Sequence, residues 1–332
     1  MALRQNTMPT MMDVVAQTSP NGNIMQLVEL LNMTNEVLDD YVAYEANDGL
    51  GHRGAIRVGL PTPTWRRMYA GVQPSKSTTT VIRDTIGNLE AFAEVDKDVA
   101  DLNGNAAAFR LQEDMAQIEG MNQKFTQTLF YGNESAEPAE FTGLAPRFNT
   151  LTAAANSDNV INAGGTGSNL SSIWLVVWGP AIHGLYPKGS KAGLSQTDMG
   201  EIVIENIDGL GGRMRAYRSH YKWYCGLHLR DWRYVVRIAN IDHAALTSTN
   251  VTGPNLIDLM TQALELPPSL SLGRAVFYVP KKIRSFLRRQ TTNRVVNSTL
   301  SVETVGGKPA VMFDTVPVRR VDALLLTESQ VI

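Results

Sequence analysis

The stretch LFYGNESAEPAEFTGLAPRFN, Leu129–Asn149, is irregular in sequence but rich in residues that pack. It contains four aromatic residues, which a flexible linker would lack, at Phe130, Tyr131, Phe141 and Phe148. It also contains glycines and prolines, which interrupt helices and strands, at Gly132, Pro138, Gly143 and Pro146. This stretch is therefore expected to be fixed in shape by packing, without being a regular element.

The segment before this stretch has the strongest helical pattern in the chain. Asn103-Gly104-Asn105 opens it, and it runs to about Tyr131, a length of ~39 Å at 1.5 Å per residue. Its apolar stripe, which predicts the packing face of a spine helix, consists of Leu111, Met115, Ile118, Phe125 and Leu129.

Composition excludes several classes of protein. The chain has 332 residues, 43% hydrophobic content, 19% charged residues and a net charge of -2, so no global charge draws it to nucleic acid or acidic membranes. A single cysteine, Cys225, excludes an intrachain disulfide framework and any multi-thiolate metal site, and it favours a reducing cytoplasm. Neither a signal peptide nor an apolar run of membrane-spanning length is visible, so no membrane association is expected.

The N-terminal region is predicted to be an arm followed by a helix. Residues 1–22 are polar and are expected to be ordered only when something holds them. Apolar residues then recur at helical spacing, with Thr34-Asn35 as an interruption, at Ile24, Leu27, Val28, Leu31, Val37, Leu38, Tyr41 and Val42.

The segment from Leu50 to Thr80 predicts a long two-stranded excursion without a core of its own. Short extended pieces alternate with Gly and Pro, and aliphatic residues are few, so the excursion should lie on another surface. Arginine and aromatic residues are enriched where proteins meet. The candidate subunit-interface residues are Arg53, Arg57, Trp65, Arg66, Arg67 and Tyr69, with a partner surface at Glu90, Glu94, Asp96 and Asp98.

The remaining pattern predicts an α+β protein. Residues 81–99 are interpreted as mixed strand and turn, and strands begin at the apolar run IWLVVW, 173–178. A helix is predicted between Pro254 and Pro267-Pro268, followed by a strand at 275–279. Strands and helices do not alternate as a doubly wound sheet requires.

No catalytic, cofactor or metal site can be assigned from the motifs. GLYPKGSK, 184–191, has phosphate-loop glycines but places Ser190 before Lys191, the reverse of the required order. The histidines lack zinc-hydrolase spacing, and the neighbours of Cys225 predict a packed thiol. A short basic helix carries candidate DNA-facing cations at Lys281, Lys282, Arg288 and Arg289, which could contact phosphates or a neighbouring acidic surface. The alternative is an ordinary solvated helix face.

Several segments together resemble the major capsid protein of tailed bacteriophages, in its short-tailed-phage branch. The resemblance rests on NLEAFAEVDKDVADLNG (88–104), QEDMAQIEGMNQKFTQTLFYGN (112–133), EFTGLAPRFN (140–149), YKW..GL...DWRYVVRIANID (221–242) and PVRRVDALLLTESQV (317–331). It covers most of the chain, and the helix followed by FYGN and a GLAPR-type turn is its most specific part.

This resemblance implies the shell fold shared with herpesvirus capsids. The expected parts are an N-terminal arm and helix at 1–48, an extended loop at 49–82, and a peripheral domain with the spine helix at 83–150. A β-rich segment at 151–250 and C-terminal helices and strands at 251–332 complete the axial and peripheral domains. The long strands around 198–238 are an alternative to 49–82 as the projecting loop; we favour 49–82.

The resemblance also implies a function. Copies of the chain would form hexamers and pentamers that close into an icosahedral shell around double-stranded DNA, as a late virion protein made in the host bacterial cytoplasm. Relatives use scaffolding, portal and cement proteins, and no cofactor is implied. The alternatives are a carbohydrate-active hydrolase that uses the acidic run and a nucleic-acid-binding module that uses the basic helix; shell-like particles in the electron microscope would dismiss the hydrolase.

Overall fold

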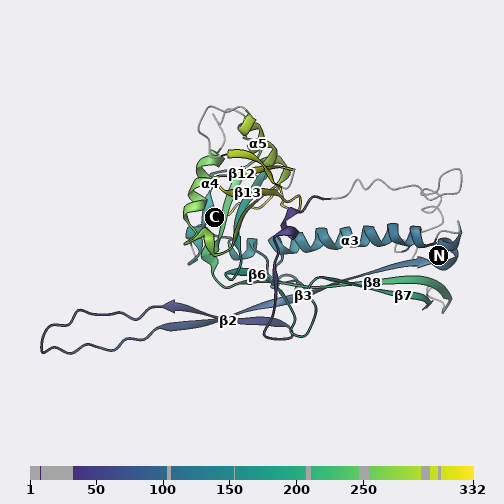
Figure 1. Cartoon of the computed structure of the whole chain (residues 1–332), viewed down its shortest axis with the longest axis horizontal. Helices are drawn as coiled ribbons and strands as arrows, with labels where there is room; N and C mark the ends of the chain where they lie inside the picture. Colours follow the sequence, from purple (N-terminus) through teal and green to yellow (C-terminus); the bar gives the residue numbers. More distant parts are fainter. Residues whose placement is uncertain are drawn as a thin grey trace. The chain divides into compact units, whose positions relative to one another are not determined.

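A computed structural model describes residues 8, 33–102, 106–152, 154–206, 211–246, 254–292, 300–305 and 308–332 (Figure 1). These residues form two compact units. The first unit contains Asn88–Thr126 and Gly193–Tyr224, together with Met33; the second contains Thr34–Gly87, Gln127–Ala192 and Cys225–Ile332.

The described elements mix helices and strands, as expected for an α+β protein. The helices are α2 Lys97–Asp101, α3 Ala106–Tyr131, α4 Leu256–Glu265 and α5 Lys281–Thr292, with 3-10 turns η1 Glu36–Asp39, η2 Ala145–Arg147, η3 Ser157–Asn159, η4 Trp232–Tyr234 and η5 Leu270–Leu272. The strands are β1 Ala43–Glu45, β2 Gly51–Gly59, β3 Thr78–Asp96, β4 Val160–Asn162, β5 Leu170–Trp178, β6 Ile182–Tyr186, β7 Leu194–Glu205, β8 Arg213–Leu229, β9 Val235–Asp242, β10 Arg274–Val279, β11 Leu300–Val305, β12 Lys308–Phe313 and β13 Val316–Arg320.

In the first unit, α3 packs on β3 and β8 through a face that the sequence pattern does not predict. Phe109 is buried with Val95 of β3, and Met121 is buried with Ala93 and Tyr221. Further along α3, the ring of Phe125 lies 4.3 Å from that of Trp223, measured between centroids.

The predicted spine stripe is therefore wrong in its first three residues, since Leu111, Met115 and Ile118 are exposed. In this half of α3, polar side chains share the inward face with Phe109: Arg110 donates to Asp198 of β7 at 2.6 Å, and Asp114 accepts from Ser219 of β8. One residue is a rotation of about 100° around a helix, so pairing through Arg110 turns its neighbour Leu111 away. Only Phe125 and Leu129 of the stripe are buried.

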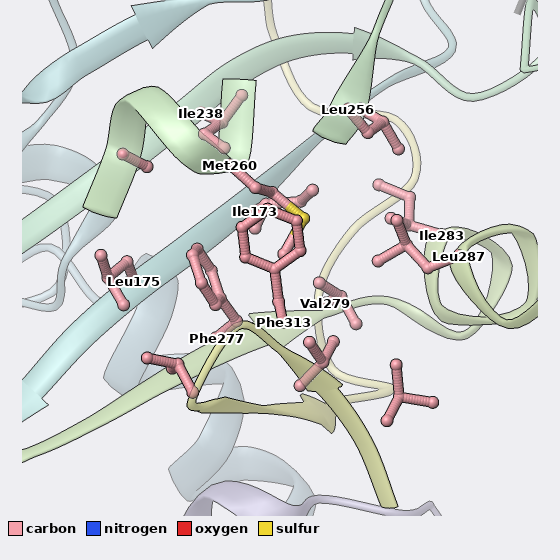
Figure 2. Close-up of a cluster of buried hydrophobic side chains, with 14 of the residues drawn as sticks. Ile173, Leu175, Ile238, Leu256, Met260, Phe277, Val279, Ile283, Leu287 and Phe313 are labelled. Carbon is pink, nitrogen blue, oxygen red and sulfur yellow. The ribbon is translucent and has the colours of Figure 1, made fainter. Parts of the chain in front are cut away.

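In the second unit, a seven-stranded sheet carries the main hydrophobic core. Its strand order is β11-β12-β13-β10-β5-β9-β4, and α4 and α5 cover one face of it. Figure 2 shows side chains of this core, among them Met260 of α4, Ile173 of β5 and Phe277 of β10, with Ile283 and Leu287 of α5 on one side. The predicted helix at 254–266 and strand at 275–279 are confirmed.

All nine residues of β5 are buried, because the irregular stretch 129–149 covers its other face. Phe130 and Phe148 lie 6.2 and 6.1 Å from Trp174, centroid to centroid. Backbone hydrogen bonds from Gly143 to Gly132 (2.8 Å) and from Leu144 to Leu129 (3.1 Å) fold the stretch back on the end of α3. The expectation of a bend fixed by packing is confirmed.

Two other expectations differ from the structure. Residues 81–99 are not strand and turn: β3 is one continuous strand through Asp96, where the Asp96 side chain accepts from the Asp98 amide and starts α2. The arm and the first half of the predicted N-terminal helix, up to residue 32, lie outside the described residues. Its second half forms η1 and β1 instead, because β1 pairs with β6 and a helix would remove those hydrogen bonds.

Candidate subunit interface

The predicted excursion is an antiparallel hairpin. β2 and β3 pair from Gly51 opposite Thr85 to Gly59 opposite Thr78, and the chain between them forms the outer end of the hairpin (Figure 1). Arg53 and Arg57 lie exposed along β2. This arrangement confirms two strands without a core of their own.

The outer end of the hairpin presents large apolar side chains to solvent. Trp65 and Tyr69 are each 103% exposed and Met68 is 90% exposed, so nothing in the described part of the chain covers them. Arg66 Nε donates to the carbonyl of Ala70 at 2.8 Å, which closes a local turn in which Tyr69 has φ +62°. Exposed aromatic clusters of this kind mark interaction sites.

The root of the hairpin is fixed by a buried carboxylate, Asp84 of β3. Asp84 accepts hydrogen bonds from Nδ1 of His228 at 2.6 Å and from the amide of Leu229 at 3.2 Å, and it pairs with Arg147 at 2.8 Å. Burial opposes ionisation of Asp84, but the His228 hydrogen bond and the Arg147 charge outweigh it and lower its pKa. Arg147 belongs to the GLAPR turn, so the bend after α3 also anchors the hairpin.

Three histidine rings from different strands pack beside Asp84. His52 of β2 lies 4.4 Å from His228 of β8, and His183 of β6 lies 5.2 Å from His228, between centroids. Burial, then repulsion from His228, lowers the pKa of His183 to about 4. His183 is therefore neutral at neutral pH and packs without a charge.

Sequence reasoning missed this root, because its parts come from five separate elements, β2, β3, the GLAPR turn, β6 and β8. The one local signal is an aspartate inside the apolar and hydroxyl-rich strand TVIRDTIG, 80–87.

Three of the four acidic residues proposed as a partner surface, Glu90, Glu94 and Asp96, are engaged within the first unit. Glu90 pairs with Lys222 at 3.0 Å and with His220 at 3.3 Å, and Glu94 accepts from Arg218 Nε at 2.6 Å. Hydrogen bonds, first from Asn88 and then from Lys222, lower the pKa of Glu90 to about 2. An arginine of a neighbouring subunit would have to compete with these cations for Glu90 and Glu94. Asp96 is likewise engaged, because its side chain caps α2.

The basic helix α5 is amphipathic, as predicted. Ile283, Phe286 and Leu287 are buried, whereas Lys281, Lys282, Arg288 and Arg289 are exposed. The Arg289 guanidinium lies 5.9 Å from the Phe286 ring, which holds its stem along the helix.

A second buried charged group that sequence reasoning missed ties the C-terminal segment to the sheet. Glu328 accepts from Arg237 at 2.8 Å, from Ser172 at 2.5 Å and from Tyr131 at 2.5 Å. Arg237 also donates to the carbonyl of Phe148 at 2.7 Å. One ionised pair thus joins α3, the bend, β5, β9 and the C-terminal segment.

The described residues contain no group of three or more His, Cys, Asp or Glu side chains arranged to hold a metal ion. Cys225 is buried, and desolvation raises its pKa to about 12, so it is a packed thiol as expected. Within the described ranges, no helix has the length and apolarity to cross a membrane.

Comparison with known proteins gives one clear relationship. A family model described as major capsid protein GP7 matches residues 19–332. A chain from the structure of bacteriophage epsilon15 is 40% identical, with 100% of this chain and 99% of that chain covered and a TM-score of 0.79. A chain of the bacteriophage JBD30 capsid is 11% identical over 89% of this chain and 93% of its own, with a TM-score of 0.47. Among curated sequences no match is found.

Proposed function

Because the chain belongs to the major capsid protein GP7 family, and is thus a structural capsid protein of the virion and not an enzyme, we propose that its copies assemble as hexamers and pentamers into an icosahedral shell around double-stranded DNA. The fold is the mixed α+β fold of tailed-phage capsid proteins, and the protein is a homo-oligomer in the shell. Many modest interfaces, repeated over a closed shell, would supply its stability.

The observation that carries this proposal furthest is the hairpin of β2 and β3. Its outer end exposes Trp65, Met68 and Tyr69, which a solitary protein would leave in water at a cost in solubility. Its root, by contrast, is fixed through Asp84 and Arg147. A rigid root with an uncovered aromatic end suits an extended loop, residues 49–82, that overlaps a neighbouring subunit.

On the neighbour, the acidic run remains the proposed acceptor for Arg66 and Arg67. Glu90 and Glu94 would then share their carboxylates between Lys222 or Arg218 and the incoming guanidinium. A carboxylate has enough lone pairs for such sharing, and arginine can bind it through two parallel hydrogen bonds.

The other parts are assigned as predicted from the sequence. The N-terminal segment is assigned to 1–48, where the described part holds η1 and β1 in place of the predicted helix. The peripheral domain with the spine helix is assigned to 83–150, and the remaining two segments complete the axial and peripheral domains. Strand β7 and most of β8 belong to the same compact unit as most of α3, which favours a peripheral position for them. Scaffolding, portal and cement proteins are proposed partners, and synthesis takes place in the host bacterial cytoplasm.

The test of the hairpin is a double charge reversal, Arg66→Glu with Arg67→Glu. Repulsion across the interface should block shell formation without unfolding the subunit, because neither side chain has a role in a core. The matched control is Lys188→Glu with Lys191→Glu, two exposed cations in a loop of the same unit. Electron microscopy of particles and thermal unfolding of the subunit provide the two readouts.

Normal shells from the Arg66/Arg67 variant would refute the hairpin interface. Lowered thermal stability of its unassembled subunit would instead mean that the hairpin stabilises its own unit. Shell loss in the lysine control as well would show general sensitivity to charge.

The face of α5 with Lys281, Lys282, Arg288 and Arg289 is proposed to contact packaged DNA. Phosphate contacts by such cations release counterions and are not sequence-specific. Changing the two lysines to Gln should leave shells intact but lower the amount of DNA retained per particle, as measured by absorbance ratio. Unchanged DNA content would remove α5 as the DNA-facing element.

A further inference from the structure

A groove lies beside the hairpin, between residues 55–60 of β2 and its continuation and residues 230–234, which follow β8. Both walls belong to the second unit. The groove has a volume of about 730 Å³, which is enough for several side chains of a partner. Its lining is mainly apolar and open to solvent, since Val58 is 64% exposed and Leu60 77%.

Two cations of this groove have no acidic partner. Arg57 of β2 and Arg230 are both exposed, and no carboxylate of the described residues pairs with either of them. The acidic residue of the lining, Asp231, is already bound by Arg233, through Nε at 3.0 Å and a terminal nitrogen at 2.7 Å. The groove therefore fits a partner that presents a carboxylate beside small apolar side chains.

An exposed turn in the bend after α3, residues 134–139, has this chemistry. Glu137 is exposed, no cation of the described residues pairs with it, and its neighbours Ala136 and Pro138 are small and exposed. The amides of Ala136 and Glu137 donate to the Asn133 carbonyl at 3.0 and 2.9 Å, which makes the turn compact. A segment already fixed in shape loses little entropy when it binds.

The acidic run at 90–98 fits the groove less well. Glu90 pairs with Lys222 at 3.0 Å, and Glu94 pairs with Arg218. The arginines of the groove would have to displace these cations, whereas Glu137 needs no such exchange.

We propose that the turn 134–139 of one copy docks in the groove of a second copy, with the Glu137 carboxylate facing Arg57 and Arg230. The groove contains none of residues 134–139, so two different patches of the chain meet. Such a heterologous contact links copies head to tail and closes into a ring. The inference rests on the proposed assembly of the chain into a shell, and it adds a second contact, distinct from the end of the hairpin.

The experiment is crosslinking within assembled shells of the full-length chain. Ala55→Cys in the wall of the groove is combined with Ala136→Cys in the turn, and the shells are treated with a short bis-maleimide. Native Cys225 is buried and does not compete. The control combines Ala55→Cys with Ala192→Cys, an exposed alanine elsewhere in the same unit.

Each copy of the Ala55/Ala136 variant carries both thiols, so a head-to-tail contact should give a ladder of products that continues beyond the dimer on a denaturing gel. The Ala55/Ala192 control should give much less of it. A reaction that is complete but stops at the dimer would overturn the proposal, because it indicates a two-fold contact.

Two other outcomes separate this inference from the proposed function. Shells without crosslinks, although their thiols react with a small maleimide, would overturn the docking and leave the proposed shell in place. Failure of the parent chain to form shells would overturn the proposed function, and the docking with it.

A charge exchange covers the case in which the cysteine variant does not assemble. Arg57→Glu should lose most of its shells, because Glu137 then meets a like charge. Adding Glu137→Arg restores an opposite pair and should recover the shells, whereas adding Glu265→Arg, at an exposed site of α4, restores only the net charge and should not. Normal shells from Arg57→Glu, no recovery by Glu137→Arg, or equal recovery by both additions would refute the proposal.

Discussion

Replacing Glu328 by Gln tests the buried charged group of the second unit most directly. The Glu328 and Arg237 side chains are each only 5% exposed, and the carboxylate accepts from Arg237, Ser172 and Tyr131. Glutamine keeps the shape and one acceptor oxygen but removes the negative charge. Arg237 is then left in the interior as a cation whose remaining bonds are to Ser172 and to the carbonyl of Phe148.

The magnitude follows from the burial of the pair. Breaking a buried ion pair by removing one partner costs about 3–5 kcal/mol, and the retained amide acceptor places Glu328→Gln near the lower limit, about 3 kcal/mol. With a urea dependence of about 3 kcal/mol per M, the unfolding midpoint should fall by about 1 M. Intrinsic tryptophan fluorescence provides the measurement, and Trp174, which lies 5.1 Å from the Arg237 guanidinium, contributes to it.

Two further variants make the result decisive. Arg237→Met with Glu328→Leu removes both charges together and should recover most of the stability, because no uncompensated ion remains. Glu137→Gln changes an exposed carboxylate and should leave the midpoint in place. If the free energy of unfolding of Glu328→Gln stays within about 0.5 kcal/mol of that of the parent protein, the buried pair contributes no more than a surface ion pair, and the reasoning fails.

Three other predictions concern the bend, the hairpin root and the spine. Gly143→Ala should cost about 2 kcal/mol or more in urea unfolding, because its Cβ would lie 2.5 Å from the Thr128 carbonyl, whereas Gly71→Ala, with open space around it, should not. The pKa of His183 is about 4 in the folded protein, below the ordinary 6.5. Between pH 4 and pH 6.5 the unfolded chain therefore binds more protons than the folded protein, and the free energy of unfolding should decrease from pH 6.5 towards pH 4. An unchanged urea midpoint over this pH range would contradict the burial of His183. Phe125→Asp should unfold the first unit in circular dichroism, whereas Met115→Asp should leave it folded, and equal loss in both would restore the predicted stripe.

The local sequence determined the elements with strong internal patterns. Pro254 and Pro267-Pro268 bracket α4, and the apolar run at 173–178 belongs to β5, because start signals and periodicity act over a few residues. The aromatics of 129–149 predicted a bend held by packing, and Phe130 and Phe148 do pack on Trp174. The hairpin followed from an aliphatic-poor segment between glycines and prolines.

Only the tertiary structure decided which faces these elements bury. The apolar residues of α3 by themselves predict a buried stripe that includes Leu111. The ion pair of Arg110 with Asp198, 88 residues away, instead turns Leu111 outward. Asp84, Arg147 and His228 meet because three separate segments converge, and no periodicity encodes such a meeting. A sequence pattern indicates the preference of a residue for burial. The partner that pairs with a charge or covers an apolar face is determined by long-range contacts, which form only when the chain folds.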